Sequence, residues 1–347
     1  MRYQLLGRSG LKVSEACLGT ITFGKEWGYG ASKRTCWKIL DEFASRGGNF
    51  IDTANNYTDG ASERIVGEML QSERAKFVIG TKYTMSIRAG DPNASGNHRK
   101  SLVQALEGSL TRLNTDYIDV YWVHAWDGFT PAEEVARALD DVVRAGKVLY
   151  IGISDTPAWF VAQSTTMADL RGWSRFVGLQ TELSLLERTA ERELLPMART
   201  FGLTLVPWGV LGGGVLTGKY AGGVPRGSRR AAKNRDRITA RNLSIASEAA
   251  TISAEIGCPP SQVAIAWVRQ RALVHGLGVT PILGARTLAQ IRENLDGLKL
   301  TLSEGHLERL ENATSISLGF PHELLARPSV QNALHGGVLH LTDGHRP

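Results

Sequence analysis

The sequence predicts an α/β protein with a (β/α)8 barrel fold, also known as a TIM barrel. Short apolar runs rich in β-branched residues alternate eight times with longer amphipathic segments, which favours a closed barrel over an open doubly wound sheet. A length of 347 residues suits one barrel with insertions, and no repeat or linker divides the chain. We therefore expect one domain over residues 1–347, with the barrel at about 14–300 and a tail at about 301–347.

Strands are expected where the chain is briefly apolar and β-branched. In chain order they cover residues 16–20, 49–54, 77–82, 117–124, 150–154, 178–181, 204–208 and 279–284. Helices are expected where apolar residues recur at helical spacing, as Ile65, Val66 and Leu70 do among charged neighbours. In chain order they cover residues 32–46, 61–72, 98–113, 131–145, 157–170, 189–201, 243–271 and 287–297.

Two segments lie outside these eight units. Residues 3–5 and 11–13 flank the turn sequence Gly7-Arg8-Ser9-Gly10 and predict a small β-hairpin that plugs the bottom of the barrel. Residues after about 315 are rich in His, Gly and Pro, and they predict an irregular C-terminal tail near the barrel mouth.

Composition excludes several classes of protein. An apolar fraction of 42% with 21% charged residues is globular rather than disordered. The three cysteines are odd in number and far apart, which predicts no disulfide framework and a cytoplasmic, reducing location. The first residues lack the features of a signal peptide. The longest uncharged stretch, 201–218, contains Pro207 and six glycines, so we expect no membrane span.

The net charge of +6 is concentrated in one basic run. Its members within 16 residues are Arg226, Arg229, Arg230, Lys233, Arg235, Arg237 and Arg241. A solvated surface loop is the favoured interpretation. A mobile flap attracted to an anionic cofactor and a nucleic-acid-binding patch are the alternatives. We expect no nucleic-acid partner.

Four ionisable residues fall at or just after the ends of successive strands. Asp52 ends the second expected strand and Tyr57 follows in its loop, while Lys82 and His124 end the third and fourth. Because barrel enzymes place their chemistry at these ends, and neighbouring strands lie about 4.8 Å apart, the four side chains can converge.

This group suits carbonyl reduction. A hydride added to a carbonyl carbon leaves an alkoxide that needs a proton, and the phenol of Tyr57 can supply it. An adjacent Lys82 ammonium lowers the pKa of the phenol, Asp52 orients the ammonium, and the His124 imidazole directs the carbonyl oxygen. Taken singly, each residue has an ordinary structural interpretation, such as a turn carboxylate or a core histidine. Their joint placement favours the catalytic interpretation.

At these residues the chain resembles the aldo-keto reductases. The hairpin Leu6–Ser14, the segment Asn49–Tyr57 with Ser62–Gly67, and the segments Thr81–Tyr83 and Asp119–His124 are similar to that family's motifs over about residues 3–325. The resemblance implies that Tyr57 is the acid–base, Lys82 tunes it, Asp52 pairs with Lys82, and His124 orients the substrate. Within the family, the Trp27–Ala31 loop and the Gly319–His322 segment resemble a branch of bacterial reductases.

The end of the barrel at residues 281–294 resembles the family's NADP-binding site. A strand that runs into Gly284 and then a helix start offers backbone N–H groups and a dipole to a phosphate. Arg286 can add a forked charge for the ribose 2′-phosphate of NADP(H), with Glu293 and Asn294 toward the adenine. The resemblance implies further cofactor contacts from Gly19, Thr20, Asp52, Ser154, Asp155, Gln180, Trp208, Gly209, Leu211, Lys219 and Gln290.

Three positions depart from the family pattern. Asp155 replaces the usual Asn, so an acceptor stands where a donor is expected. Gly209-Val210 follows Trp208 in place of Ser-Pro, and Leu183 replaces a common tyrosine. These departures affect the expected nicotinamide contacts and leave the four catalytic candidates unchanged.

Two other patterns do not alter this interpretation. Gly213–Lys219 has the spacing of a phosphate-binding loop, but Tyr220 replaces the Ser or Thr that would hold magnesium. His335, His340 and His345 recur at five-residue steps, which is more typical of a polar tail than of a metal site, so we expect no metal.

For the substrate we expect a small carbonyl compound held by Trp27, Tyr57, Tyr83, His124 and Trp126. The resemblance implies keto-sugars, secondary-metabolite ketones or xenobiotic aldehydes, and the fold does not choose among them. A different hypothesis is a non-catalytic NADPH-binding subunit similar to the auxiliary potassium-channel subunits that share this barrel. The sequence leaves open whether the chain forms a homo-oligomer.

Overall fold

Among the residues described by the computed structural model, which are 1–220, 223 and 234–342, eight parallel strands form one sheet. Their spatial order is β10-β3-β4-β5-β6-β7-β8-β9. The strands are β3 (Cys17–Gly19), β4 (Phe50–Asp52), β5 (Val78–Tyr83), β6 (Ile118–Val123), β7 (Val148–Ser154), β8 (Phe176–Gln180), β9 (Thr204–Leu205) and β10 (Ile282–Gly284). Each expected strand is therefore present.

The sheet closes on itself between β9 and the segment that leads into β10. Leu205 forms a parallel bridge with Val279, and the N–H of Thr280 donates to the carbonyl oxygen of Leu205 at 2.9 Å. The N–H of Ile282 donates in the same way to Pro207 at 2.9 Å. A closed sheet leaves no unpaired edge, and the expected (β/α)8 barrel is confirmed.

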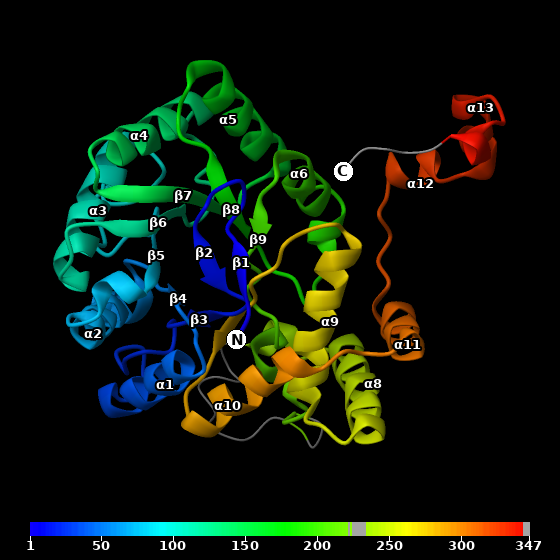
Figure 1. Ribbon diagram of the computed structural model, residues 1–347, viewed down its shortest axis with the longest axis horizontal. Coiled ribbons are helices and arrows are strands. Elements are labelled where there is room, and N and C mark those ends of the chain that lie inside the picture. Colours follow the sequence, from blue (N-terminus) through cyan, green and yellow to red (C-terminus); the bar gives the residue numbers. More distant parts are fainter. Residues whose placement is uncertain (221–222, 224–233, 343–347) are drawn as a thin grey trace.

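Helices alternate with the strands and surround the sheet (Figure 1). They are α1 (Lys33–Ser45), α2 (Ala61–Leu70), α3 (Arg99–Leu113), α4 (Ala132–Arg144), α5 (Ala158–Arg171), α6 (Leu194–Phe201), α8 (Ala240–Ile256), α9 (Pro260–Val274) and α10 (Leu288–Asp296). The predicted helix at 243–271 is two helices, α8 and α9. Gly257 has a left-handed φ of 78°, and Pro259 caps the next helix, so this Gly-Cys-Pro-Pro sequence ends one helix and starts another.

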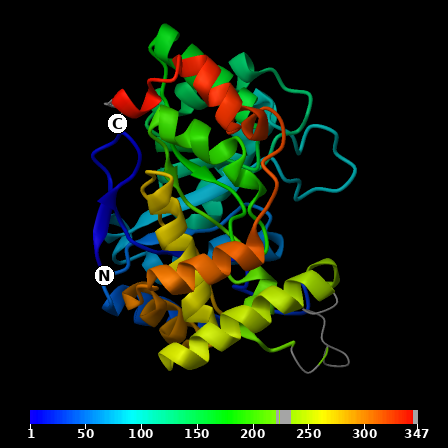
Figure 2. The same cartoon turned by 90° about the vertical axis from the view of Figure 1, so that its right-hand side faces the viewer.

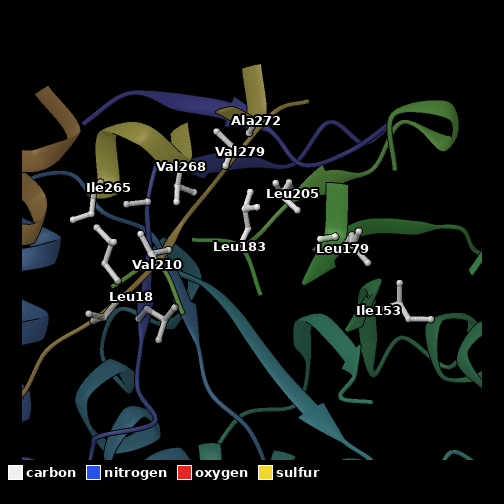
Figure 3. Packing of buried hydrophobic residues seen from close by; sticks show 14 of the residues in the cluster. Leu18, Ile153, Leu179, Leu183, Leu205, Val210, Ile265, Val268, Ala272 and Val279 are labelled. Carbon is white, nitrogen blue, oxygen red and sulfur yellow. The ribbon is translucent and has the colours of Figure 1, made fainter. Parts of the chain in front are cut away.

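Apolar side chains fill the layer between the strands and the surrounding helices (Figure 3). Leu179 and Leu205 from the strands lie in one cluster with Ile265 and Val268 of α9, and all four are fully buried. Burial of this kind contributes most of the favourable free energy of folding.

A second core fills the interior of the barrel around Trp122 of β6. Three strands have a glycine where they face this indole. A Cβ at Gly80 would lie 2.7 Å from Trp122 Nε1, and one at Gly178 would lie 2.9 Å from Cη2, so a side chain has no room at either position. A Cβ at Gly152 would overlap the ring more severely. Small residues on the neighbouring strands thus make room for one large side chain in a packed interior.

The predicted hairpin closes the bottom of this core. Strands β1 (Tyr3–Leu5) and β2 (Lys12–Ser14) pair antiparallel. Leu6 and Val13 are fully buried in the inner cluster, beside the first residues of β4 and β5. The amino ends of the strands are therefore covered, and the opposite end is left for the site.

The C-terminal segment differs in part from the prediction. After α11 (Glu304–Thr314) the chain forms the short helices α12 (His322–Leu325) and α13 (Pro328–His335), so the expectation of an irregular tail was wrong. These helices stand apart from the ring of helices in Figure 1, and Figure 2 shows them in front of α5 and α6. Arg192 donates to the Ser317 carbonyl and His322 pairs with Glu193, which ties the segment to the start of α6. His345 lies outside the described residues.

Candidate active site

A cavity of about 530 Å³ lies at the carboxyl ends of the strands. The final residue of five strands lines it, and these residues are Gly19, Asp52, Ser154, Gln180 and Gly284. Lys82 from β5 and His124, directly after β6, also line it. The barrel thereby gathers residues that are far apart in the sequence around one space.

Lys82 joins the catalytic candidates at the floor of this cavity. Asp52 pairs in register with Gly80, so Lys82 lies two residues further along β5, on the same face of the strand as Gly80. Its Nζ atom donates to Asp52 Oδ2 at 2.6 Å, to the Thr53 carbonyl oxygen at 2.7 Å and to the Tyr57 hydroxyl at 3.1 Å. All three ammonium hydrogens therefore have an acceptor, which a buried charge requires.

These contacts set the protonation of the pair. Burial lowers the pKa of Lys82, but the neighbouring Asp52 and Tyr57 outweigh it and raise that pKa to about 12. Burial raises the pKa of Tyr57, while Lys82 opposes the rise. The net pKa of the phenol is raised, whereas the sequence predicted a net decrease, because burial outweighs the ammonium. Lys82 is therefore charged and Tyr57 is a neutral phenol near pH 7.

His124 lies against Tyr57 as a neutral imidazole. The two ring centroids are 5.8 Å apart, and the rings meet edge to face. Burial, with the nearby Lys82 charge, lowers the pKa of His124 to about 3. Its Nδ1 atom is buried without a hydrogen-bond partner among the described residues. The arrangement offers an uncharged ring beside the phenol where a carbonyl oxygen could be held.

The wall next to these residues comes from β7, β8 and the loop after β9. Gln180 Nε2 donates to the second oxygen of Asp52, Oδ1, at 2.7 Å, so both carboxylate oxygens are engaged. Trp208 Nε1 donates to Asp155 Oδ1 at 3.0 Å, which fixes the indole on the cavity wall. The floor of the site is thus held by hydrogen bonds from several strands.

The other end of the cavity has the features of a site for a phosphate-bearing ligand. Arg286 and Lys219 line it together with Gln290 at the start of α10. Gly213 and Gly214 also line it, and they have left-handed φ values of 66° and 95° in the 3-10 turn Gly212–Thr217. Two cations, a helix start and glycine backbone suit an anion.

These residues fit a nicotinamide dinucleotide. A dinucleotide needs a long cleft with a positive end, and the cavity runs from Asn294 on α10 to His124 beside Tyr57. Every residue expected at the cofactor lines it, and they are Gly19, Thr20, Asp52, Ser154, Asp155, Gln180, Trp208, Gly209, Leu211, Lys219, Gly284, Arg286, Gln290, Glu293 and Asn294.

Comparison with known proteins identifies the family. The model of the aldo/keto reductase family matches residues 15–314, which is most of the chain. The chain belongs to the aldo-keto reductase family. As a member it is an oxidoreductase that acts on carbonyl or alcohol groups.

Related aldo-keto reductases occur in fungi and bacteria. A norsolorinic acid reductase of Emericella nidulans is 37% identical over 335 residues, covering 91% of this chain and 82% of its own. An aryl-alcohol dehydrogenase of Pestalotiopsis microspora is 36% identical over 334 residues, with coverages of 93% and 85%. An uncharacterized oxidoreductase of Bacillus subtilis is 38% identical over 327 residues, with coverages of 90% and 95%.

Two expected substrate residues of this aldo-keto reductase do not line the cavity. Tyr83 is fully buried, stacks on Tyr121 at 5.3 Å and donates to the Asn97 carbonyl oxygen at 3.3 Å. Its neighbour Lys82 faces the site, and adjacent strand residues point to opposite faces, so Tyr83 points into the helix layer. Trp126 packs edge to face on Trp159 at 5.8 Å, outside the residues that line the cavity.

The remaining substrate candidates, Trp27, Tyr57 and His124, do line the cavity. Ile21 and Asn56, which the sequence analysis did not single out, line it as well, together with Thr22, Met85 and Val210. All of them follow or adjoin strand ends. This position in the barrel is the feature from which the sequence could have predicted them at the cavity. Leu183, one of the departures from the aldo-keto reductase pattern, is instead fully buried in the core (Figure 3).

Of the members of the basic run that the structure describes, Arg237 belongs to the site. Arg237 lines the cavity and forms a two-point ion pair with Glu182, with Nη2 to Oε2 at 2.9 Å. Arg241 donates to the Leu186 carbonyl oxygen, and Arg235 lies in a short 3-10 turn. The other four members of the run, Arg226, Arg229, Arg230 and Lys233, lie outside the described residues.

The described ranges contain neither a membrane-spanning helix nor a cluster of metal ligands. No helix in them combines the length and apolar character needed to cross a membrane. Within the same ranges, no three His, Cys, Asp or Glu side chains gather as a metal site would require.

Proposed function

We propose that this protein reduces an aldehyde or ketone to an alcohol with NADPH, and that Tyr57 is its general acid–base. The observation that carries the proposal is the contact of Lys82 Nζ with both Asp52 and Tyr57 inside the cavity. A buried, charged lysine next to a phenol stabilises the charge that develops when the phenol gives up its proton.

Each residue has a defined role in this reaction. The chemistry that NADPH would supply when bound is a hydride for the carbonyl carbon. The Tyr57 hydroxyl donates its proton to the carbonyl oxygen, and Lys82 stabilises the resulting phenolate. Asp52 keeps Lys82 charged and in place, since its two oxygens are held by Lys82 and Gln180. Neutral His124 orients the carbonyl oxygen without competing for the proton, because its pKa is about 3.

Positively charged side chains at the far end of the cavity support a preference for NADP(H) over NAD(H). Arg286 and Lys219 line the far end of the cavity, and Arg286 directly precedes Thr287, the N-cap of α10. A guanidinium can bind a 2′-phosphate through two parallel hydrogen bonds, whereas a free 2′-hydroxyl gains far less from it.

The cavity and the relatives favour an aromatic carbonyl substrate. Ile21, Trp27 and Met85 give the substrate side apolar and aromatic surface. One relative is named aryl-alcohol dehydrogenase and so acts, by its name, on an aromatic alcohol, and another is named norsolorinic acid reductase. We propose a small aromatic aldehyde or ketone, including carbonyls of secondary metabolites. The free thiols of Cys17, Cys36 and Cys258 fit a cytoplasmic location.

The experiment is NADPH oxidation with a panel of aldehydes and ketones, using wild type and Tyr57→Phe. We expect turnover by wild type and a loss of about 100- to 10,000-fold in the variant. Cofactor affinity, measured by tryptophan fluorescence, should change little. Tyr83→Phe is the matched control, since Tyr83 lies outside the cavity.

The same experiment tests the non-catalytic alternative. An NADPH-binding regulatory subunit would bind the cofactor with similar affinity and oxidise it with no member of the panel. Binding without turnover in wild type would therefore overturn the proposed enzyme and favour that alternative.

A further inference from the structure

Asn56 lies in the wall of the cavity directly before Tyr57, outside the set of residues expected at the cofactor. It is the N-cap of the 3-10 turn Tyr57–Gly60. Asparagine is favoured at an N-cap because its side chain accepts a hydrogen bond from a backbone N–H of the following turn. The side chain of Asn56 forms no such bond, so the usual structural role of an asparagine at this place is missing.

Other contacts hold the segment around Asn56. Its backbone carbonyl oxygen accepts from the Asp59 N–H at 3.2 Å, and Trp27 Nε1 donates to Asp59 Oδ1 at 3.1 Å. On the other side, Asn55 Nδ2 donates to the Met85 carbonyl oxygen at 2.9 Å. These contacts join the turn to the loops that carry Trp27 and Met85, and both of these residues line the cavity. Asn56 therefore lies between two loops of the substrate side, and its own carboxamide takes no part in joining them.

The carboxamide oxygen of Asn56, Oδ1, is buried and has no hydrogen-bond partner among the described residues. Of the other buried side-chain polar atoms in this state, the one on a cavity-lining residue is Nδ1 of His124. Buried polar groups are nearly always hydrogen-bonded, so an exception in the wall of a cavity indicates a group that a ligand satisfies. A half-turn of the carboxamide exchanges its oxygen and its N–H2 group, so Asn56 can offer a ligand either an acceptor or a donor.

We propose that Asn56 is a specificity-determining residue that forms a hydrogen bond with a hydroxyl group on the substrate, and so favours hydroxylated aromatic carbonyls over their methyl analogues. This inference deepens the proposed function and rests on it. Ile21, Trp27 and Met85 give the substrate side apolar and aromatic surface, where a hydroxyl group without a partner loses the hydrogen bonds that it makes in water. A carboxamide in such a wall distinguishes a hydroxyl from a methyl group, although the two are similar in size.

The test compares hydroxybenzaldehydes with methylbenzaldehydes, each substituted at the ortho, meta or para position, at pH 6, where the phenols are neutral. For each position the ratio of kcat/KM for the hydroxy compound to kcat/KM for the methyl compound is measured. In Asn56→Leu, which replaces the carboxamide with an apolar group of similar size, this ratio should fall about 3- to 10-fold at the ring position that meets residue 56. Asn56→Ala should give the same pattern without a new branched side chain. Asn312→Leu makes the same change at an exposed position of α11 and should leave every ratio as in wild type.

The ratio is taken within each protein, so a general effect of the substitution on turnover cancels. A hydrogen bond from one side chain is directional, and its loss should therefore act at one ring position more than at the others. Ratios that equal those of wild type at all three positions, or that fall by the same factor at all three, would overturn the inference.

A binding measurement needs no turnover. The protein with NADPH is titrated with hydroxybenzyl and methylbenzyl alcohols while tryptophan fluorescence is followed, and no reaction occurs because the alcohol and the cofactor are both reduced. Asn56→Leu should weaken binding of the hydroxy compound relative to the methyl compound by about 3- to 10-fold at the same ring position. Equal ratios of dissociation constants in the two proteins would contradict the inference. Failure of wild type to reduce any carbonyl of the panel contradicts the proposed function instead, and the binding comparison still tests Asn56.

Discussion

The ammonium nitrogen of Lys82 lies 3.1 Å from the hydroxyl oxygen of Tyr57, although the two residues come from different strand–loop units. The same nitrogen contacts Asp52 Oδ2 and the Thr53 carbonyl oxygen. One buried charge therefore links the end of β5 to the end of β4 and the loop that follows it. Its removal should affect both the chemistry and the stability of the barrel.

Lys82→Met should lower kcat by about 100-fold or more. Lys82 opposes the effect of burial on Tyr57, so without it the pKa of the phenol rises further and the phenolate is harder to form. Asp52 is 2% exposed and would lose its ion-pair partner, which typically costs about 3–5 kcal/mol of stability.

Steady-state kinetics and urea unfolding measure the two effects of Lys82→Met separately. Lys76→Met serves as the control, because Lys76 lies in an exposed 3-10 turn before β5 and pairs with Glu73 at the surface. Wild-type turnover in Lys82→Met would contradict the assigned role of the ammonium.

The sequence could predict the Asp52–Lys82 contact because both residues end neighbouring parallel strands. The same logic should have excluded Tyr83 from the cavity, since its neighbour Lys82 already faces inward and strand side chains alternate. The expectation of Tyr83 at the substrate considered its place at the strand end and not this alternation. The outer position of Tyr83, stacked on Tyr121, follows from that alternation.

Other features depend on tertiary contacts that no local pattern encodes. The ion pair of Arg237 with Glu182 joins residues 55 positions apart in the sequence. The sequence of the basic run alone therefore does not predict that Arg237 lines the cavity. The pKa of Tyr57 required knowledge of its burial, which outweighs the effect of Lys82. The helices α12 and α13 lie in a segment whose Gly and Pro content indicated irregular structure.

Gly152→Ala should lower the free energy of unfolding by about 1–3 kcal/mol. The added methyl group would overlap the indole of Trp122, which fills the barrel interior and cannot move away from the surrounding strands. Urea unfolding measures the loss. Gly305→Ala on α11 is the control, because its Cβ would enter open space and its stability should stay equal or rise slightly. Equal stabilities for both variants would contradict this account of the core.

The pH profile of reduction should lack a titration from His124. With an uncharged substrate, kcat should be constant from pH 7 to 9 and fall only above about pH 10, because the phenol donates while protonated and its pKa is raised above the ordinary 10.0. The pKa of His124 is about 3, so the imidazole stays neutral throughout this range. A step near pH 6.5 to 7.5 that disappears in His124→Gln would show that the imidazole titrates, against the expectation.

Arg286→Ala should weaken NADPH binding about 10- to 100-fold, as expected for the loss of a charge-assisted contact, and NADH binding by much less. The guanidinium lines the cavity one residue before the N-cap of α10, where it can reach a 2′-phosphate but has no matching group on NADH. Cofactor titrations followed by tryptophan fluorescence give both dissociation constants. Arg292→Ala removes an arginine from the same helix that pairs with Glu42 outside the cavity, so it should bind both cofactors as wild type does. If Arg286→Ala weakened NADH as much as NADPH, the residue would act on a part common to both cofactors, and the preference for NADP(H) would need another source.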